Sequence, residues 1–204
     1  MIINYNFSFF FNHLINAEIH NKNFQINSKN IGDFVTNADI KTEKILLETL
    51  KYYYPEASYI TEESNNIEGN DETLVIDPID GTTNFIHGIP YFAISIALEE
   101  YDQITAGVIY EPINDQMFWA ERGNGAWLND RRMRVSGRTN MEQSIFATGI
   151  PFLGRGDHKR FLKQIEAVMA VSAGIRRFGS AALDLAYVAA GRFDGFWENG
   201  LQPW

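Results

Sequence analysis

The sequence predicts an α+β fold, with an antiparallel meander sheet in a first lobe and a smaller α/β second lobe. Between residues 92 and 128, four strand-like segments are separated by short turns rich in Gly, Asn and Asp, as in consecutive antiparallel strands. After residue 140, strand-like and helix-like segments alternate, which is typical of α/β units. We therefore expect a first lobe over residues 1–140 and a second over residues 141–204.

Composition narrows the class of protein. The 204 residues include 45% hydrophobic and 14% aromatic side chains, enough for a sizeable core. A formal charge of −9 without a basic stripe argues against direct nucleic-acid binding. With no Cys, the chain has no disulfide, thiolate nucleophile or zinc–thiolate site. No apolar run approaches a membrane span and no signal-peptide pattern is visible, so we expect a cytoplasmic protein.

Residues 1–54 predict two helices, with a short strand and a loop between them. Residues 1–23 are rich in Phe, Ile and Asn, and we expect an amphipathic helix that packs in the core or in a dimer rather than on a membrane. A strand over residues 24–27 and a polar loop over residues 28–32 should follow. Asp39 then lies in the first turn of a helix that ends before Pro55. Its apolar stripe is expected to contain Ile40, Leu47, Leu50 and Tyr54.

The most informative stretch is residues 74–85. Residues 74–76 are apolar and predict a buried strand, which we expect to stop at Pro78 because proline has no N–H for the ladder. Asp77 and Asp80 lie on either side of this proline, with the Ile79 carbonyl between them. A kinked turn can aim these oxygen atoms at one point, and oxygen ligands suit Mg²⁺. The alternative is a proline turn with two solvated aspartates.

A phosphate site is expected directly after these acids. Gly81 frees the backbone, and Thr82, Thr83 and Asn84 are residues that start helices. Free N–H groups at a helix start attract phosphate. Upstream, a strand over residues 58–61 ends in Glu62 and Glu63, an acidic pair that is usually solvated.

The remaining segments follow in order. Further strands are expected over residues 92–98, 104–110, 116–120 and 125–128, and a solvated basic patch comprises Arg131, Arg132, Arg134 and Arg138. In the second lobe we expect strands over residues 144–149, 175–178 and 193–197. Helices should run from the Gly and Asp residues at 154–157 to about residue 172, and from residue 179 to residue 190.

The motif DPIDGTTNF at residues 77–85 resembles the signature of the inositol monophosphatase family, which belongs to the Mg²⁺-dependent, Li⁺-sensitive phosphatases. Asp33, Val35, Thr36 and Asp39 match the family pattern D-x-V-T-x-x-D, and residues 62–64 match its E-E-S motif. The resemblance is to the bacterial type and implies a layered α-β-α-β-α, sugar-phosphatase-like fold.

The resemblance also implies roles for individual residues. Two or three Mg²⁺ ions would be held by Glu62, Asp77, the Ile79 carbonyl and Asp80, and Li⁺ would inhibit. Asp39 and Thr82 would be catalytic, because they activate the attacking water. Substrate would be bound by Glu62, Ile79, Asp80, Gly81, Thr82, Thr83, Gly179, Ser180, Ala181 and Glu198.

The resemblance breaks at the last residue. Family members continue Pro-Trp-Asp, and that Asp is a metal ligand, whereas this chain ends at Pro203 and Trp204. The match extends from Asp33 to Trp204, so the chain resembles a family member truncated at its C-terminus, with an incomplete second lobe. We expect weak or no activity for this exact chain on that ground.

The implied function is Mg²⁺-dependent hydrolysis of a small polyol phosphate, foremost inositol monophosphate to inositol and phosphate, by a metal-activated water. Other members of the superfamily act on fructose 1,6-bisphosphate, nucleotide 3′-phosphates or histidinol phosphate, and these substrates remain alternatives. A protein-binding role in transcription, through a contact with RNA polymerase, and an inactive fragment are further alternatives. Relatives are usually homodimers, which the aromatic N-terminus would permit.

Overall fold

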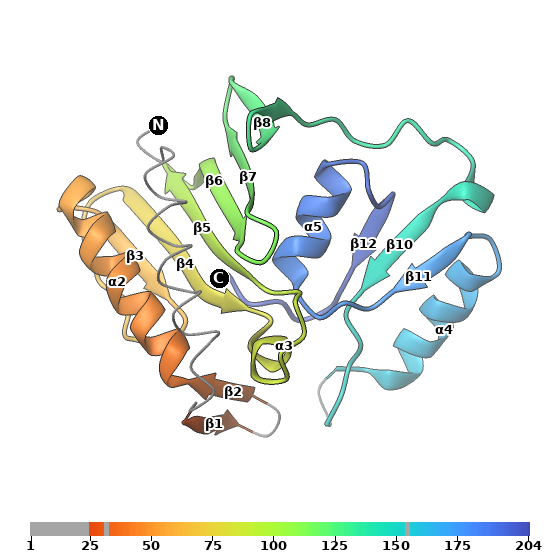
Figure 1. Cartoon of the computed structure of the whole chain (residues 1–204), viewed down its shortest axis with the longest axis horizontal. Coiled ribbons are helices and arrows are strands. Elements are labelled where there is room, and N and C mark those ends of the chain that lie inside the picture. Colours follow the sequence, from red (N-terminus) through yellow and green to blue (C-terminus); the bar gives the residue numbers. More distant parts are fainter. Residues whose placement is uncertain (1–24, 31–32, 154–155) are drawn as a thin grey trace.

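The computed structural model describes residues 25–30, 33–153 and 156–204, so the helix expected over residues 1–23 lies outside the described residues. Within these ranges the strands form a hairpin, a large sheet and a small sheet, and helices lie between and outside the sheets (Figure 1). No helix in the described part of the chain is both long and apolar enough to cross a membrane.

A hairpin and a capped helix come first. β1 (Ile26–Asn30) pairs antiparallel with β2 (Asp33–Thr36), and α2 (Asn37–Tyr53) follows directly. The strand expected over residues 24–27 therefore begins and ends later, because its pairing with β2 extends it through part of the expected loop. Thr36 caps α2, since its Oγ1 accepts the N–H of Ala38 and its own N–H donates to the Asp39 carboxylate.

The buried face of α2 agrees with the expected stripe at Leu50, and Leu47 and Tyr54 pack partly buried against the same cluster, but the expectation is wrong for Ile40. Ile40 was expected in the apolar stripe but is 52% exposed, whereas Ala38, Leu46 and Leu50 are buried. The buried positions 38, 42, 46 and 50 recur every four residues and define a face that position 40 does not share. Polar Thr42 lies on this face because tertiary packing, rather than hydrophobicity alone, sets the rotation of the helix.

The large sheet confirms the meander and adds a parallel strand. Its β5 to β9 strands run antiparallel to their neighbours, as does β4 with β5, but β3 runs parallel to β4. The sheet is therefore mixed rather than purely antiparallel. In spatial order it contains β3 (Ser58–Thr61), β4 (Glu72–Asp80), β5 (Ala93–Glu100), β6 (Gln103–Glu111), β7 (Gln116–Glu121), β8 (Gly125–Leu128) and β9 (Arg131–Arg132).

β4 does not stop at Pro78, contrary to the expectation from the sequence. It continues to Asp80 through a β-bulge: Asp77 pairs with Ser95 while Asp80 pairs with Ala93, so three steps along β4 match two along β5. A bulge leaves one residue out of the ladder, and proline is tolerated there because its missing N–H is not needed. The bulge also changes the direction in which the following carboxylate points.

The small sheet lies within residues 141–204, the range expected to form the second lobe, and is entirely parallel. β10 (Ile145–Thr148) lies between β11 (Gly174–Arg176) and β12 (Gly195–Trp197), after the short helix η1 (Met141–Gln143). α4 (His158–Met169) contacts β11, and α5 (Ala181–Ala189) contacts strands of both sheets. The layers are therefore α2, large sheet, α5, small sheet and α4, which confirms the layered α-β-α-β-α architecture (Figure 1).

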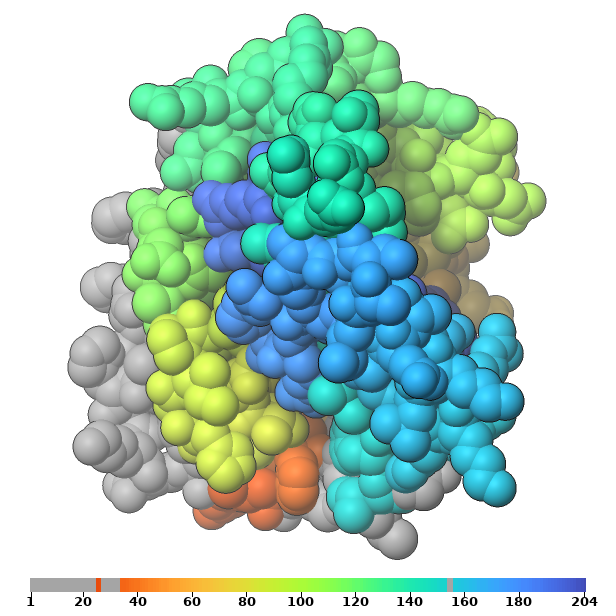
Figure 2. Space-filling model, turned by 90° about the vertical axis from the view of Figure 1, so that its right-hand side faces the viewer, coloured from red at the N-terminus to blue at the C-terminus, as the bar shows by residue number. Residues whose placement is uncertain are grey.

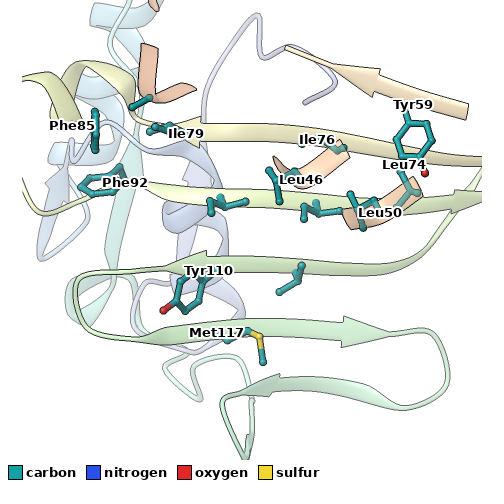
Figure 3. Close-up of a cluster of buried hydrophobic side chains, with 14 of the residues drawn as sticks. Leu46, Leu50, Tyr59, Leu74, Ile76, Ile79, Phe85, Phe92, Tyr110 and Met117 are labelled. Atoms are coloured by element: carbon teal, nitrogen blue, oxygen red, sulfur yellow. The ribbon is translucent and has the colours of Figure 1, made fainter. Parts of the chain in front are cut away.

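Two apolar clusters hold α2, the large sheet and α5 together. The first fills the space between α2 and the large sheet, with Leu46, Leu50, Ile76 and Ile96 among its members (Figure 3). The second joins α5 to the other face of the sheet through Leu183 and neighbouring side chains. The segment that carries α3 (Thr82–Ile86) contacts residues 178–179, and Figure 2 shows residues 141–204 in teal to blue beside this segment in yellow-green.

The first cluster allows a stability test. Leu46→Ala should lower the free energy of unfolding by about 3 kcal/mol, because it removes a fully buried side chain and leaves a cavity. Urea unfolding followed by circular dichroism measures this change. Ile40→Ala on the same helix is the matched control and should change the free energy by less than about 0.5 kcal/mol. Similar losses for both variants would contradict the observed rotation of α2.

Candidate active site

Asp39 and Thr82 meet at the start of α2, although they are 43 positions apart in sequence. The Asp39 carboxylate is buried, and its Oδ2 accepts from the Thr36 N–H at 2.8 Å and the Thr36 hydroxyl at 2.6 Å. Its Oδ1 lies 3.1 Å from the Thr82 Oγ1. One carboxylate oxygen is thus occupied by the helix cap, while the other faces the predicted catalytic threonine. Burial raises the pKa of Asp39, and the hydrogen bonds from Thr36 and Thr82 oppose that shift.

Gly81 gives the turn after β4 its shape. It is the N-cap of α3, with φ at 97°, a left-handed conformation that favours glycine. A Cβ at this position would lie 3.2 Å from the Gly179 carbonyl oxygen, so the two lobes approach closely here. The turn brings the Thr82 Oγ1 within 3.0 Å of the Ile79 carbonyl oxygen. The Thr82 hydroxyl therefore lies close to both the Ile79 carbonyl and the Asp39 carboxylate. Thr83, the next residue of α3, is exposed.

The predicted metal ligands are close enough to interact. Burial, followed by the negative charges of Asp80 and Glu62, raises the pKa of Asp77 well above its usual value. The Asp77 side chain is only 7% exposed, and its Oδ1 has no hydrogen-bond partner among the described residues. An unpaired buried carboxylate oxygen beside other acids is unfavourable unless a proton or a cation compensates the charge.

Asp80 is shared with the second lobe. Its Oδ2 accepts from the Ser180 hydroxyl at 2.5 Å and from the Ala182 N–H at 2.7 Å. Burial raises the pKa of Asp80, and these bonds together with the Ala181 N–H oppose the shift. Ser180 is the N-cap of α5, so the carboxylate of Asp80 completes the first turn of that helix.

Glu62, Asp77 and Asp80 lie near one another, but their oxygen atoms do not yet surround one point as metal ligands would. Over residues 25–30, 33–153 and 156–204, no three His, Asp or Glu side chains form a group that could already hold a metal ion. One reason is visible: one oxygen of Asp80 is turned toward α5. The donor set nevertheless fits Mg²⁺, since it consists of oxygen atoms, includes the unpartnered Asp77 Oδ1 and gathers charge that a cation would neutralise.

The structure shows positioning contacts that the sequence did not reveal. The Asn84 side chain donates to the Tyr91 carbonyl and, across the lobes, to the Phe178 carbonyl, each at 2.7 Å. Glu43 of α2 is buried and accepts the Glu63 N–H at 2.8 Å, which fixes the loop that carries Glu62. Only weak signals for these two contacts are present in the sequence, because Asn84 resembles an ordinary helix-start residue and Glu43 an ordinary helix acid.

Asp184 is a further buried acid near the site. Its carboxylate accepts from the Tyr91 hydroxyl at 2.8 Å and is 2% exposed. Burial raises the pKa of Asp184 to about 7; the bond from Tyr91 opposes the shift and the charge of Asp80 adds to it. A carboxylate that titrates this high responds to pH in the neutral range.

A pocket of about 780 Å³ opens beside these acids. Its wall includes Glu62 from the first lobe and Gly149, Trp197 and Glu198 from the second. Burial and the charge of Asp80 raise the pKa of Glu198, while Arg177 opposes the shift. Glu62 and Glu198, which the sequence analysis placed in one site, thus line the same pocket. Gly179, Ser180 and Ala181 form the turn that leads into α5, beside Asp80.

The titration of Asp184 leads to a pH prediction. Its pKa rises from 3.8 to about 7 on folding, so between these values the folded protein binds more protons than the unfolded chain. This acid therefore lowers stability progressively as pH rises through the window, and adds no further loss above it. Asp184→Asn retains an acceptor for Tyr91 but cannot ionise.

When the pH rises from about 4.5 to about 7.5, the melting temperature of the unchanged protein should fall. The melting temperature of Asp184→Asn should fall less over the same range. Thermal unfolding of both proteins at a series of pH values measures the difference. Parallel curves would show that Asp184 does not titrate in this window.

Comparison with known proteins identifies the family. The family model described as "Inositol monophosphatase family" matches residues 4–204. An inositol-1-monophosphatase of Mesorhizobium japonicum is 52% identical over 185 residues, covering 90% of this chain and 70% of the relative. A protein of Escherichia coli K12 named Nus factor SuhB is 44% identical over 182 residues, covering 88% of this chain and 68% of the relative.

A solved structure agrees with this assignment. The crystal structure of the extragenic suppressor protein suhB from Bartonella henselae is 52% identical and superposes with a TM-score of 0.90. The match covers 94% of this chain and 74% of that one. Sequence motifs, layered fold and whole-chain similarity therefore agree: the chain belongs to the inositol monophosphatase family.

Proposed function

We propose that this chain acts as a phosphatase, at the weak level expected from its sequence, and hydrolyses inositol monophosphate to inositol and phosphate. The observation that carries the proposal is the contact between Thr82 and Asp39 beside the acids Glu62, Asp77 and Asp80. It joins a proton acceptor to a group of carboxylates suited to a divalent cation, which is what metal-assisted ester hydrolysis needs. Relatives about 50% identical carry the name inositol-1-monophosphatase, which supports the choice of substrate.

Asp39 and Thr82 would manage the proton of the attacking water. Thr36 holds the Asp39 Oδ2 with two donors, so the carboxylate cannot rotate freely and its Oδ1 stays directed at Thr82. The Thr82 hydroxyl then donates to Asp39, and its oxygen keeps lone pairs that can accept from a water. The water is thereby oriented, and its proton has a path through Thr82 to Asp39.

The acids would bind the metal ions, and backbone N–H groups would bind the phosphate of the substrate. Glu62, Asp77, the Ile79 carbonyl and Asp80 would hold Mg²⁺, which supplies charge neutralisation at the phosphate and acidifies water. The proposal includes two or three Mg²⁺ ions and inhibition by Li⁺. The N–H groups of Gly81, Thr82 and Thr83 would bind phosphate oxygens, and Gly179, Ser180, Ala181 and Glu198 would contact the alcohol.

A charge-removing variant tests the proton path. Asp39→Asn should lower kcat for inositol 1-phosphate by about 100-fold or more, because the amide cannot take the proton. Phosphate release is measured with MgCl₂ and, separately, with EDTA, which should abolish turnover. Asp130→Asn, at an exposed position, is the control and should match the unchanged protein. An unchanged kcat in Asp39→Asn would remove Asp39 from the mechanism.

Other substrates and roles are separated by further measurements. A panel with fructose 1,6-bisphosphate, 3′-phosphoadenosine phosphate and histidinol phosphate tests the alternatives, and inositol 1-phosphate should be preferred. The 44% identity to a Nus factor favours, as a second candidate, a contact with RNA polymerase. Exposed Arg131, Arg132 and Arg134 are the residues to substitute in a polymerase pull-down, whereas Arg138 is paired with Asp194. A homodimer and a cytoplasmic location stay predictions.

A further inference from the structure

The position of the Glu198 side chain depends on a glycine, Gly149. β10 and β12 run parallel, and Thr148 pairs with Trp197 at the last step of their register. Buried Thr148 also donates its hydroxyl to the Trp197 carbonyl at 2.8 Å. Gly149 and Glu198 are the next residues of the two strands. They therefore emerge together at the carboxyl ends of parallel strands, where ligands bind in α/β sheets.

The Glu198 carboxyl group occupies the space in which a side chain at position 149 would lie. A Cβ built on Gly149 would overlap the carboxyl carbon and both oxygen atoms of Glu198. Any residue other than glycine would thus displace this carboxylate. Gly149 does not need glycine for its backbone, because it is absent from the positive-φ glycines of the described chain.

The same contact faces the proposed substrate. Gly149 and Glu198 both line the pocket of about 780 Å³ that also contains Glu62. Glu198 lies near enough to Asp80 for the charge of Asp80 to raise its pKa. The carboxylate of Glu198 therefore lies in the pocket wall, close enough to Asp80 for their charges to interact. From this position it can contact the alcohol part of a phosphate ester bound in the pocket.

We propose that Gly149 is a specificity-determining residue, which lets the Glu198 carboxylate sit where it binds the hydroxyl groups of a polyol. The inference rests on the proposed phosphatase function and deepens it. Carboxylates bind paired hydroxyl groups through short, charge-assisted hydrogen bonds that tolerate little displacement. An ester whose alcohol lacks hydroxyl groups would not use this contact. Gly149 thus acts through Glu198 and needs no contact with the phosphate.

Gly149→Ala is the direct test, and the protein should fold normally. The group that must move is the far end of a flexible side chain, so the melting temperature should stay within about 2 °C of the unchanged protein. KM for inositol 1-phosphate should rise about tenfold, the effect of one hydrogen bond to a charged group. KM and kcat for methyl phosphate, which has no free alcohol hydroxyl, should not change.

Gly137→Ala is the matched control, because a Cβ there meets nothing within 4 Å. This variant should leave both substrates unaffected. A double-mutant cycle with Glu198→Ala then separates a positioning role from a general effect on folding. If Gly149 acts through Glu198, Gly149→Ala should have no further effect in the Glu198→Ala background.

Failure of the proposed phosphatase function and failure of the proposed role of Gly149 give different results. If the unchanged protein does not turn over inositol 1-phosphate in MgCl₂, the proposed function fails. If it does, and Gly149→Ala keeps the same KM, or raises KM equally for methyl phosphate, the role of Gly149 is overturned. Additive effects of Gly149→Ala and Glu198→Ala would also overturn it, because two independent effects add and a shared one does not.

Discussion

The bond between Asp80 and the first turn of α5 is the contact on which the site depends. It joins residues that are about a hundred positions apart, with the Ser180 hydroxyl and the Ala182 N–H on one carboxylate oxygen. The carboxylate satisfies backbone donors that would otherwise be unpaired at the start of the helix. It also fixes α5, and hence the second lobe, relative to the end of β4. Metal-site acids and substrate-site residues are thereby held in one frame.

The bulge in β4 makes this contact possible. Without the extra residue, Asp77 and Asp80 would follow a regular ladder, in which side chains alternate between the two faces of the sheet. The shift in pairing between Asp77 and Asp80 instead ends the strand with the two acids close enough to interact, and with Glu62 next to Asp77. Pro78 suits this place because it gives no N–H to a ladder that is already interrupted. A local irregularity of the backbone is thus the origin of the concentrated charge.

That concentration of charge is unfavourable for the folded protein alone. Asp77 is buried near two other acids, and its pKa is raised for that reason. Nearby, Asp184 and Glu198 also have raised pKa values, caused first by burial. Groups of this kind are typical of sites that bind cations or perform catalysis, where binding compensates a cost in stability. The neutral Asn84, which bridges carbonyls of both lobes, strengthens the site without adding charge.

The sequence by itself determined the family, the acidic motif and most of the order of the elements, although strand β2 was not expected. The pattern of residues 77–85 predicted a carboxylate site next to a helix start, because these features are local and depend on neighbouring residues. The strands of the meander were also predictable, since turn residues separate them at short intervals. Only the tertiary structure decided the continuation of β4 through Pro78, the rotation of α2 that exposes Ile40, and the pairing of Asp80 with Ser180. These features arise from contacts between segments distant in the chain, whose energies no local pattern contains.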